Sequence, residues 1–238
     1  MERTSLTSVQ PPAGLPLPKP SDLENRAFHP FGAARKMQHM TELTPESVAS
    51  DPIAQFRAWF QDALDAGVRQ PEAMTLATAT PDGLVSARTV LMRGVDERGF
   101  AFYTNLESAK AADLDANPRA ALVFHWRELE RQVRIVGPVS RLDDAESTDY
   151  WASRPRGHRV SAWASPQSRP VTDAELAARL AEVEARFAAS EPPLPPFWGG
   201  YLVGLDELEL WQGQRDRLHD RVLYRRSDEG FVRTRLAP

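Results

Sequence analysis

Five short segments decide the fold, and they read MTLATAT (74–80), ARTVLMRGV (87–95), FAFYTN (100–105), AALVFHW (120–126) and QVRIVGPVSRL (132–142). They are rich in β-branched and aromatic side chains, which are typical of β-strands. Turn signals separate some of them, at Pro81-Asp82-Gly83 and between Asp96 and Gly99. Because the segments follow one another closely, they predict antiparallel hairpins, since parallel strands would need longer crossover connections.

Helical patterns flank these strands. The first helix is predicted between Asp51, which fits an N-cap, and Gly67, which ends it. Its apolar residues recur at spacings of three and four, at Ile53, Phe56, Phe60 and Leu64. A second long helix is predicted over 173–189, where Thr172 and Glu175 form a capping box. Its apolar stripe, which we expect to be buried, consists of Leu176, Leu180, Val183 and Phe187.

Shorter elements complete the pattern. Short helices are expected at 108–116 and 143–153, and further strands at 201–211, 222–226 and 231–236. Together the elements predict an α+β, mostly antiparallel protein whose sheet forms a barrel with flanking helices. No G-x-G-x-x-G motif follows a strand, so a Rossmann domain is not expected. A nucleotide-like cofactor would therefore need side-chain cations to hold its phosphate.

The chain is predicted to divide into an arm and a domain. Residues 1–45 are rich in proline and show no apolar period, which predicts a partly disordered N-terminal arm. Residues 46–238 are predicted to form a single domain. A chain of 238 residues, 42% of them hydrophobic, is long enough to bury a core of this size.

Composition excludes several classes of function. The chain has no Cys, which rules out disulfides, Cys-ligated zinc, iron–sulfur clusters and thiol nucleophiles. Its five His are scattered without metal-ligand spacing, so we expect no metal site, and no G-x-S-x-G motif supports a serine hydrolase. No apolar run approaches the roughly 18 residues that a membrane span needs, and no apolar signal segment opens the sequence. We therefore expect a cytoplasmic protein without a membrane partner.

The charged residues are unevenly chosen. The formal net charge of -4 does not indicate a nucleic-acid partner. Of the 29 basic residues only Lys19, Lys36 and Lys110 are lysines, so 26 are Arg. This bias is explained either by drift in a GC-rich genome or by a demand for forked donors at phosphate or carboxylate sites.

Two segments carry candidate anion-binding residues. Arg88 lies in a predicted strand near the turn at 81–83, and Lys110 follows Ser108 at the start of a predicted helix, where amides and an ammonium can hold a phosphate. Arg93 would point to the opposite face from Arg88 in a regular strand. Tyr150 and Arg154, four residues apart, would share a helix face and grip an anion. The alternative for each is a solvated charge or a core aromatic.

Two further segments fit a ligand site. The stretch 161–168 is polar and predicted to be a loop that delivers side-chain amides and hydroxyls. In 211–221, Trp211 ends a strand, and Arg217, His219 and Arg221 alternate, so they would share one face if the backbone is extended. A basic aromatic stripe also suits nucleic acid, but the interleaved Asp216 and Asp220 argue against it. A flavin fits better, because a cation near its pyrimidine ring stabilises the reduced anion.

These residues belong to a longer series of motifs. In order they are Arg88-Thr-Val-Leu-Met-Arg93, Phe102-Tyr103-Thr104-Asn105, Ser108-Ala-Lys110, Asn117-Pro118, Glu130-Arg131-Gln132-Val133, Ser153-Arg154-Pro155-Arg156, Ala162-Trp163, Gln167-Ser168, Trp198-Gly199-Gly200, Trp211 to Arg221 and Arg235-Leu236-Ala237-Pro238. As a set, over roughly residues 48–238, they resemble the pyridoxamine 5′-phosphate oxidase family. The resemblance implies an FMN-binding split β-barrel that works as a homodimer, with FMN in a cleft between the subunits.

The resemblance also implies roles for single residues. The implied FMN contacts are Arg88, Tyr103, Thr104, Lys110, Gln132, Gln167, Ser168, Trp211 and Arg221, with Arg88 and Lys110 on the phosphate. The implied substrate contacts are Arg93, Tyr150, Arg154, His158, Arg217 and His219, with Tyr150 and Arg154 on the substrate phosphate. Arg217 and His219 are also the candidate catalytic residues, because they would orient the substrate. Arg35 is loosely aligned with a lid segment.

The implied reaction is oxidation of pyridoxamine or pyridoxine 5′-phosphate to pyridoxal 5′-phosphate, with O2 reduced to hydrogen peroxide. The sequence departs from the family pattern at three positions, where Arg93 replaces a usual Lys, His158 a frequent Ser, and Gln38 a common Tyr. All three concern the substrate. Two alternatives therefore stay open: an FMN-dependent oxidase of another small aromatic substrate, of the phenazine-biosynthesis type, and a flavin-binding module without turnover.

Overall fold

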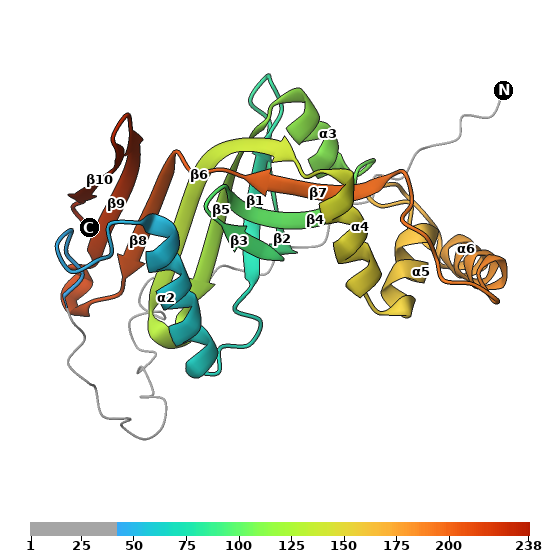
Figure 1. The fold of residues 1–238 in the computed structure, drawn as a ribbon, viewed down its shortest axis with the longest axis horizontal. Coiled ribbons are helices and arrows are strands. Elements are labelled where there is room, and N and C mark those ends of the chain that lie inside the picture. The colour runs from blue at the N-terminus through green and yellow to red at the C-terminus, as the bar shows by residue number, and fades with distance from the viewer. Residues whose placement is uncertain (1–41) are drawn as a thin grey trace, which may run out of the picture. The chain divides into compact units, whose positions relative to one another are not determined.

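Ten strands form one antiparallel sheet that carries the rest of the fold (Figure 1). The structure is a computed structural model, and it describes residues 42–238. The strands are β1 (Ala73–Ala79), β2 (Val85–Leu91), β3 (Gly94–Asp96), β4 (Gly99–Asn105), β5 (Arg119–Trp126), β6 (Arg131–Arg141), β7 (Trp198–Val203), β8 (Glu207–Gln212), β9 (Asp220–Ser227) and β10 (Gly230–Arg235). Their order is β10-β9-β8-β6-β5-β1-β2, while β4 pairs with β3 and β7, and β7 pairs with β6. Because every pair is antiparallel, the predicted α+β fold is confirmed.

Helices lie along the sheet and beyond one side of it. They are α2 (Pro52–Asp65), α3 (Ala109–Ala116), α4 (Asp144–Ser153), α5 (Arg156–Ala164) and α6 (Asp173–Arg186), with short 3-10 turns η1 (Arg127–Leu129) and η2 (Arg215–Arg217). Figure 1 shows α4, α5 and α6 following one another on the side where β7 begins. The predicted caps hold, since the Asp51 side chain accepts from the first amides of α2 and Thr172 with Glu175 forms the capping box of α6.

The core is built between α2 and the strands. The helix buries Ile53, Phe56, Trp59 and Ala63. The Phe56 ring meets Phe100 edge-on, with ring centroids 4.7 Å apart, and lies 5.0 Å from the Phe124 ring. Burial alternates along β5, so that Leu122 and Phe124 enter this core while Ala121 and Val123 face the other side of the sheet. Leu64, which the spacing placed on the apolar stripe, is 47% exposed instead.

Strand β6 joins the two parts of the sheet. Its first half pairs with β8 and its last residues pair with β7, so the predicted strand 201–211 is two strands separated at Gly204-Leu205-Asp206. The change of partner falls at Gly137-Pro138, where Pro138 has no amide to donate. Gly204 donates to the Pro138 carbonyl instead, at 2.8 Å. Residue spacing alone could not reveal this break, since both halves look like one continuous strand.

Gly137 is required by a backbone contact at this break. A Cβ on Gly137 would lie 1.9 Å from the Gly204 carbonyl oxygen. We expect Gly137→Ala to lower the free energy of unfolding by about 3 kcal/mol, because a backbone atom cannot move aside as a side chain does. Urea unfolding measures this. Gly157→Ala is the matched control, since its added Cβ meets nothing within 4 Å on α5, and it should leave stability unchanged or slightly higher.

Three other sequence predictions need correction. The predicted strand 87–95 is interrupted at Met92-Arg93, so Arg88 and Arg93 do not lie on one regular strand. The stretch 161–168 is only partly a loop, because α5 continues to Ala164. The stripe on α6 is not buried within the chain, since Leu176 and Leu180 are 40% and 37% exposed and only Phe187 is covered.

Residues 1–41 of the predicted N-terminal arm, including Arg35 and Gln38, lie outside the described residues. The boundary at residue 45 stays a prediction, and we note that Leu43 is already part of the core. Within residues 42–238, no helix is long and apolar enough to cross a membrane.

Candidate functional site

Arg88 and Lys110 come together at one end of the sheet. Arg88 lies on β2 and Lys110 in the first turn of α3. The Lys110 ammonium is buried and donates to Thr104 Oγ1 at 3.1 Å and to Ser108 Oγ at 3.2 Å, and it forms no ion pair with any described residue. Burial, and then the nearby Arg88 charge, lower the pKa of Lys110. A buried cation without an anion beside it fits a phosphate ligand.

Arg88 is held in place by three side chains. Its Nη1 donates to Thr78 Oγ1 at 2.7 Å, and its Nη2 donates to Ser86 Oγ. Asp113 lies 3.8 Å from Nη2 and also accepts from Thr78 at 2.6 Å. Burial lowers the pKa of Arg88, while the Asp113 charge acts in the opposite direction. Asp113 is thus the carboxylate that pairs with Arg88, and no described carboxylate pairs with Lys110, which leaves net positive charge for a ligand.

A pocket of about 260 Å³ adjoins these cations. Thr104, which accepts from Lys110, lines the pocket and donates to Gln167 Oε1 at 3.2 Å. Ser168 follows Gln167 with a left-handed backbone, φ 70°. Arg154, His158 and Trp198 line the pocket as well. The pocket is therefore lined by the Arg154 cation and, through Thr104, adjoins the Lys110 cation.

Three stacked aromatic rings lie beside the pocket. Tyr103 and Tyr150 stack with centroids 4.1 Å apart, and both rings are nearly parallel to Trp198, at 5.4 and 5.8 Å. Tyr103 belongs to β4, Tyr150 to α4 and Trp198 to β7. Gly200 makes room for the stack, since a Cβ there would lie 2.7 Å from the Tyr103 ring.

Arg154 lies against this stack. It follows the last residue of α4 in extended conformation, so it does not continue the helix face that the spacing predicted. Its guanidinium still lies 4.7 Å above the Trp198 ring and 5.2 Å from Trp151. Nη1 is buried and has no hydrogen-bond partner among residues 42–238. Burial lowers the pKa of Arg154, so this arginine too is a desolvated cation with a free donor.

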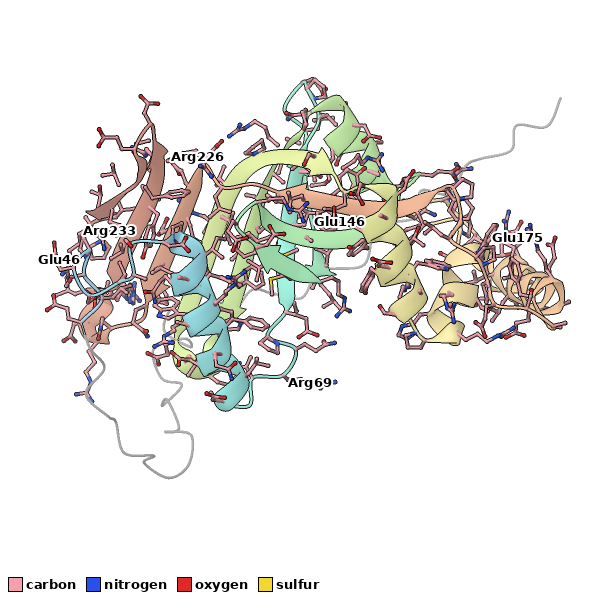
Figure 2. All side chains as sticks on the ribbon, in the orientation of Figure 1. Glu46, Arg69, Glu146, Glu175, Arg226 and Arg233 are labelled. Carbon is pink, nitrogen blue, oxygen red and sulfur yellow. The ribbon has the colours of Figure 1, made fainter. Side chains whose placement is uncertain are left out.

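The helix α4, which carries Tyr150, is tied to the sheet at Glu146 (Figure 2). Arg98 donates to Glu146 Oε1 at 2.5 Å and to Asp96 at 2.8 Å, and the Tyr103 hydroxyl donates to the Glu146 carbonyl at 3.4 Å. Tyr103 thus contacts α4 twice, through its hydroxyl at Glu146 and through its ring at Tyr150, and these contacts fix the two tyrosines relative to each other.

Two of the three positions that depart from the family pattern, Arg93 and His158, lie near Arg154. Arg93 is 3.9 Å from Glu72, and its charge contributes to the lowered pKa of Arg154. His158 is exposed on α5, and its backbone carbonyl accepts from Arg154 at 3.3 Å. Both residues are therefore close enough to Arg154 to act on the same ligand.

Gln132, Trp211 and Arg221 form a second group. They are register neighbours across β6, β8 and β9. Arg221 donates to Glu209 Oε1 at 2.8 Å and to the Ala237 carbonyl at 2.8 Å, and the same buried Glu209 accepts from Arg134 at 2.7 Å. The Glu209 hydrogen bond raises the pKa of Arg221.

Arg217 and His219 lie in the loop between β8 and β9. The predicted extended alternation is wrong here, because Asp216 and Arg217 both have left-handed backbones, with φ of 57° and 61°. Arg217 and Leu218 are exposed, and the His219 ring lies 4.6 Å from the Trp211 ring. These two residues therefore belong with the Trp211 group and not with the pocket.

The structure thus gathers the predicted residues into two groups. Arg88, Tyr103, Thr104, Lys110, Tyr150, Arg154, His158 and Gln167 surround or adjoin the pocket; Gln132, Trp211, Arg217, His219 and Arg221 lie around the β8–β9 hairpin. Sequence reasoning missed Trp198, Asp113, Glu209 and Gln214. Trp198 carried a signal as part of Trp198-Gly199-Gly200, and Gln214 as part of the run Trp211 to Arg221. Among the described residues, no His, Asp and Glu cluster could hold a metal ion.

Comparison with known proteins agrees with this architecture. The fold is a split β-barrel: the structure of PhzG from Burkholderia lata 383, in complex with tetrahydrophenazine-1-carboxylic acid, superimposes with a TM-score of 0.77 at 34% identity, over 82% of this chain and 96% of that one. Family models match residues 60–187, described as pyridoxamine 5′-phosphate oxidase, and residues 198–238, described as the pyridoxine 5′-phosphate oxidase C-terminal dimerisation region.

Curated relatives are closer in sequence. The pyridoxine/pyridoxamine 5′-phosphate oxidase of Rubrobacter xylanophilus is 54% identical over 82% of this chain and 91% of its own length. The enzyme of the same name from Salinibacter ruber is 56% identical over 83% and 94%. The chain belongs to the pyridoxine/pyridoxamine 5′-phosphate oxidase family.

Proposed function

We propose that the chain is an FMN-dependent oxidase that converts pyridoxamine or pyridoxine 5′-phosphate to pyridoxal 5′-phosphate, with O2 reduced to hydrogen peroxide. One observation carries this proposal beyond family membership. Arg154 lines the pocket, and Lys110 lies behind the lining residue Thr104 with the Arg88 charge near it, so two desolvated cationic centres lie at or next to one pocket. The cofactor and the substrate each carry one phosphate, so the two centres match the two anions.

The residues at the first centre fit FMN. Lys110 and Arg88 would bind its phosphate, because their charges exceed the single carboxylate beside them. Thr104, Gln167 and Ser168 would bind polar atoms of the cofactor at the pocket edge, and Tyr103 would support them from the aromatic stack. When bound, FMN supplies the two-electron acceptor that no protein side chain provides.

The residues at the second centre fit the substrate phosphate. Arg154 would donate through the free Nη1, and Tyr150 would add its hydroxyl, while Trp198 keeps the guanidinium in place. Arg93 and His158 would add further donors, each in a different shape from the Lys and Ser that the family pattern has there. The site needs orientation more than a strong general base, and the described residues that line the pocket include no carboxylate–His pair for that task.

The second group of residues supports a homodimer. Gln132, Trp211, Arg217, His219 and Arg221 lie in or beside the stretch that matches a dimerisation region. Leu218, between two of the proposed substrate contacts, is 70% exposed and so is free to be covered by a partner. We infer that this loop docks on a second copy, so that the hairpin of one subunit completes the pocket of the other around FMN.

The phenazine-type alternative keeps one observation in its favour, the similarity to PhzG. That structure holds a carboxylic acid, whereas the Arg154 centre here, with Tyr150 and Arg93 near it, suits a doubly charged phosphate. The third alternative, a flavin-binding module without turnover, gives no reason for the exposed Arg217.

One experiment separates the three. The purified protein is examined for a yellow flavin spectrum and then mixed with pyridoxine 5′-phosphate in air, while aldehyde and peroxide are followed. We expect bound flavin and equal amounts of both products. Flavin without turnover would favour the other substrate or the silent module, and oxidation of tetrahydrophenazine-1-carboxylic acid then distinguishes those two. A colourless protein that takes up no FMN would overturn the cofactor assignment.

A further inference from the structure

The loop between β8 and β9 is closed by one glutamine. The loop lies between the paired residues Gln212 and Asp220. It contains two residues with left-handed backbones, Asp216 and Arg217. Such non-glycine conformations cost about 1 kcal/mol or more each and persist only where neighbouring contacts hold them. Gln214 ties the two ends of this loop together, because it bonds to both residues at the far end, His219 and Asp220.

The main-chain contact of Gln214 determines which nitrogen of the neutral His219 ring carries the proton. The Gln214 amide donates to His219 Nδ1 at 3.1 Å. A ring nitrogen that accepts a hydrogen bond carries no proton, so a neutral His219 has its proton on Nε2. The Trp211 ring, 4.6 Å away at 41°, packs against the imidazole and limits its rotation. The free edge of the ring is therefore the Nε2–H donor.

The side-chain contact of Gln214 anchors the loop. Its Nε2 donates to Asp220 Oδ2 at 2.8 Å, and because a carboxylate only accepts, the orientation of this amide is fixed. Asp220 is 4% exposed, and its other oxygen accepts from Arg235 Nη2 at 2.7 Å. Both oxygens of the buried carboxylate thus accept from side chains of the protein.

We propose that Gln214 and Asp220 are positioning residues that hold His219 with Nε2–H directed outward, as the donor offered to the substrate. This inference rests on the proposed function, in which His219 orients the substrate. Asp220 acts through Gln214 and not directly on His219, although the two residues are adjacent in sequence. The chain of contacts runs from Arg235 to Asp220, to Gln214 and to the imidazole.

Gln214→Met tests the inference in the full-length FMN-loaded protein. Met keeps the volume and the backbone amide but loses the bond to Asp220, so the loop should loosen. We expect kcat/KM for pyridoxine 5′-phosphate to fall about tenfold, within the roughly hundredfold that a displacement near 1 Å can cause, while FMN affinity stays unchanged. In a His219→Ala background the same substitution should cost less than about twofold, because two residues that act through one group are not additive. Asp220→Asn should give a partial loss of the same kind.

Gln61→Met is the matched control. Gln61 donates to Asp65 at the same distance, 2.8 Å, but on the exposed face of α2, and its loss should leave kcat/KM unchanged. Independent losses for Gln214→Met and His219→Ala would overturn the proposal, and so would release of FMN by Gln214→Met.

A second readout does not depend on turnover. Long-range 1H–15N spectra of the histidine rings, with His219 assigned from the His219→Ala spectrum, should show an unprotonated Nδ1 in the wild type and a mixture of tautomers in Gln214→Met. Unchanged His219 signals in Gln214→Met would refute the positioning role. If the wild type does not oxidise pyridoxine 5′-phosphate, the proposed function fails, and this spectrum alone decides the inference.

Discussion

Lys110→Met is expected to weaken FMN binding about 100-fold, or about 2.7 kcal/mol, which is the range for a charge-assisted bond to phosphate in a desolvated site. The Lys110 ammonium has two hydroxyl partners and no carboxylate, so nothing else in the described residues satisfies its charge. Titration of the FMN-free protein with FMN, followed by the quenching of flavin fluorescence, measures the effect. Lys110→Arg should recover part of the affinity, since it restores the charge in another shape.

Although Lys110→Met should weaken FMN binding, it should not lower the free energy of unfolding of the FMN-free protein. Folding lowers the pKa of Lys110, chiefly by burial, so the charged form is less favourable in the folded state than in the unfolded state. The cost is full at pH values below the lowered pKa and disappears as the pH rises from there to the ordinary value of 10.5. Lys110→Met should therefore be as stable as the wild type or more stable at pH 7, and its advantage should shrink at alkaline pH.

Arg57→Met is the control for both measurements. Arg57 is a half-exposed cation on α2 that binds the Val95 carbonyl and lies near Glu97, and its loss should change FMN affinity by less than twofold. An FMN affinity that Lys110→Met leaves intact would remove Lys110 from the phosphate site. A loss of stability without FMN would show that the ammonium supports the fold instead.

The sheet was predictable because its signal is local. In β5 the alternation of Leu122 and Phe124 with Ala121 and Val123 reflects the two faces of a strand, and any antiparallel hairpin shows it. The change of partner along β6 was not predictable, because it depends on the contact between Gly137 and the Gly204 carbonyl, which are far apart in the sequence. The stripe on α6 failed for a related reason: an apolar spacing indicates a face that could be covered but not what covers it.

The candidate site was predictable only as a set of residues. The sequence placed Arg88 on a strand and Lys110 at a helix start, and the structure brings the two charges near each other, with Arg88 bonded to Thr78 and Lys110 to Thr104. The sequence could not show that Arg217 and His219 lie apart from this pocket, because the order of motifs along a chain does not tell which of them meet in space. The left-handed backbone at Asp216 and Arg217 could not be predicted either, since a left-handed conformation is usually signalled by glycine and neither residue is a glycine.

Arg154→Ala should raise KM for pyridoxine 5′-phosphate about 100-fold and leave FMN bound, because the free Nη1 is the strongest unused donor at the second cationic centre. A phosphate dianion that loses one forked partner keeps only Tyr150 and the more distant Arg93 and His158. The change in kcat should be smaller than the change in KM if Arg154 binds the phosphate equally well before and during oxidation. Steady-state kinetics with both phosphorylated substrates measures this.

Arg169→Ala gives the matched comparison. Arg169 lies in the loop after α5, forms a surface ion pair with Glu107 at 3.2 Å, and should be removable without a measurable change in KM. The free protein adds a second test, since Arg154 is a buried cation whose pKa is lowered by burial, and its removal should not destabilise the fold as much as the loss of a paired arginine. If Arg154→Ala instead releases FMN with KM unchanged, the two cationic centres serve one ligand, and the substrate phosphate must bind elsewhere. The expected rise in KM, with FMN still bound, would mean that the phosphates of FMN and of the substrate bind at separate centres at the same time, which is the condition that the proposed oxidation requires.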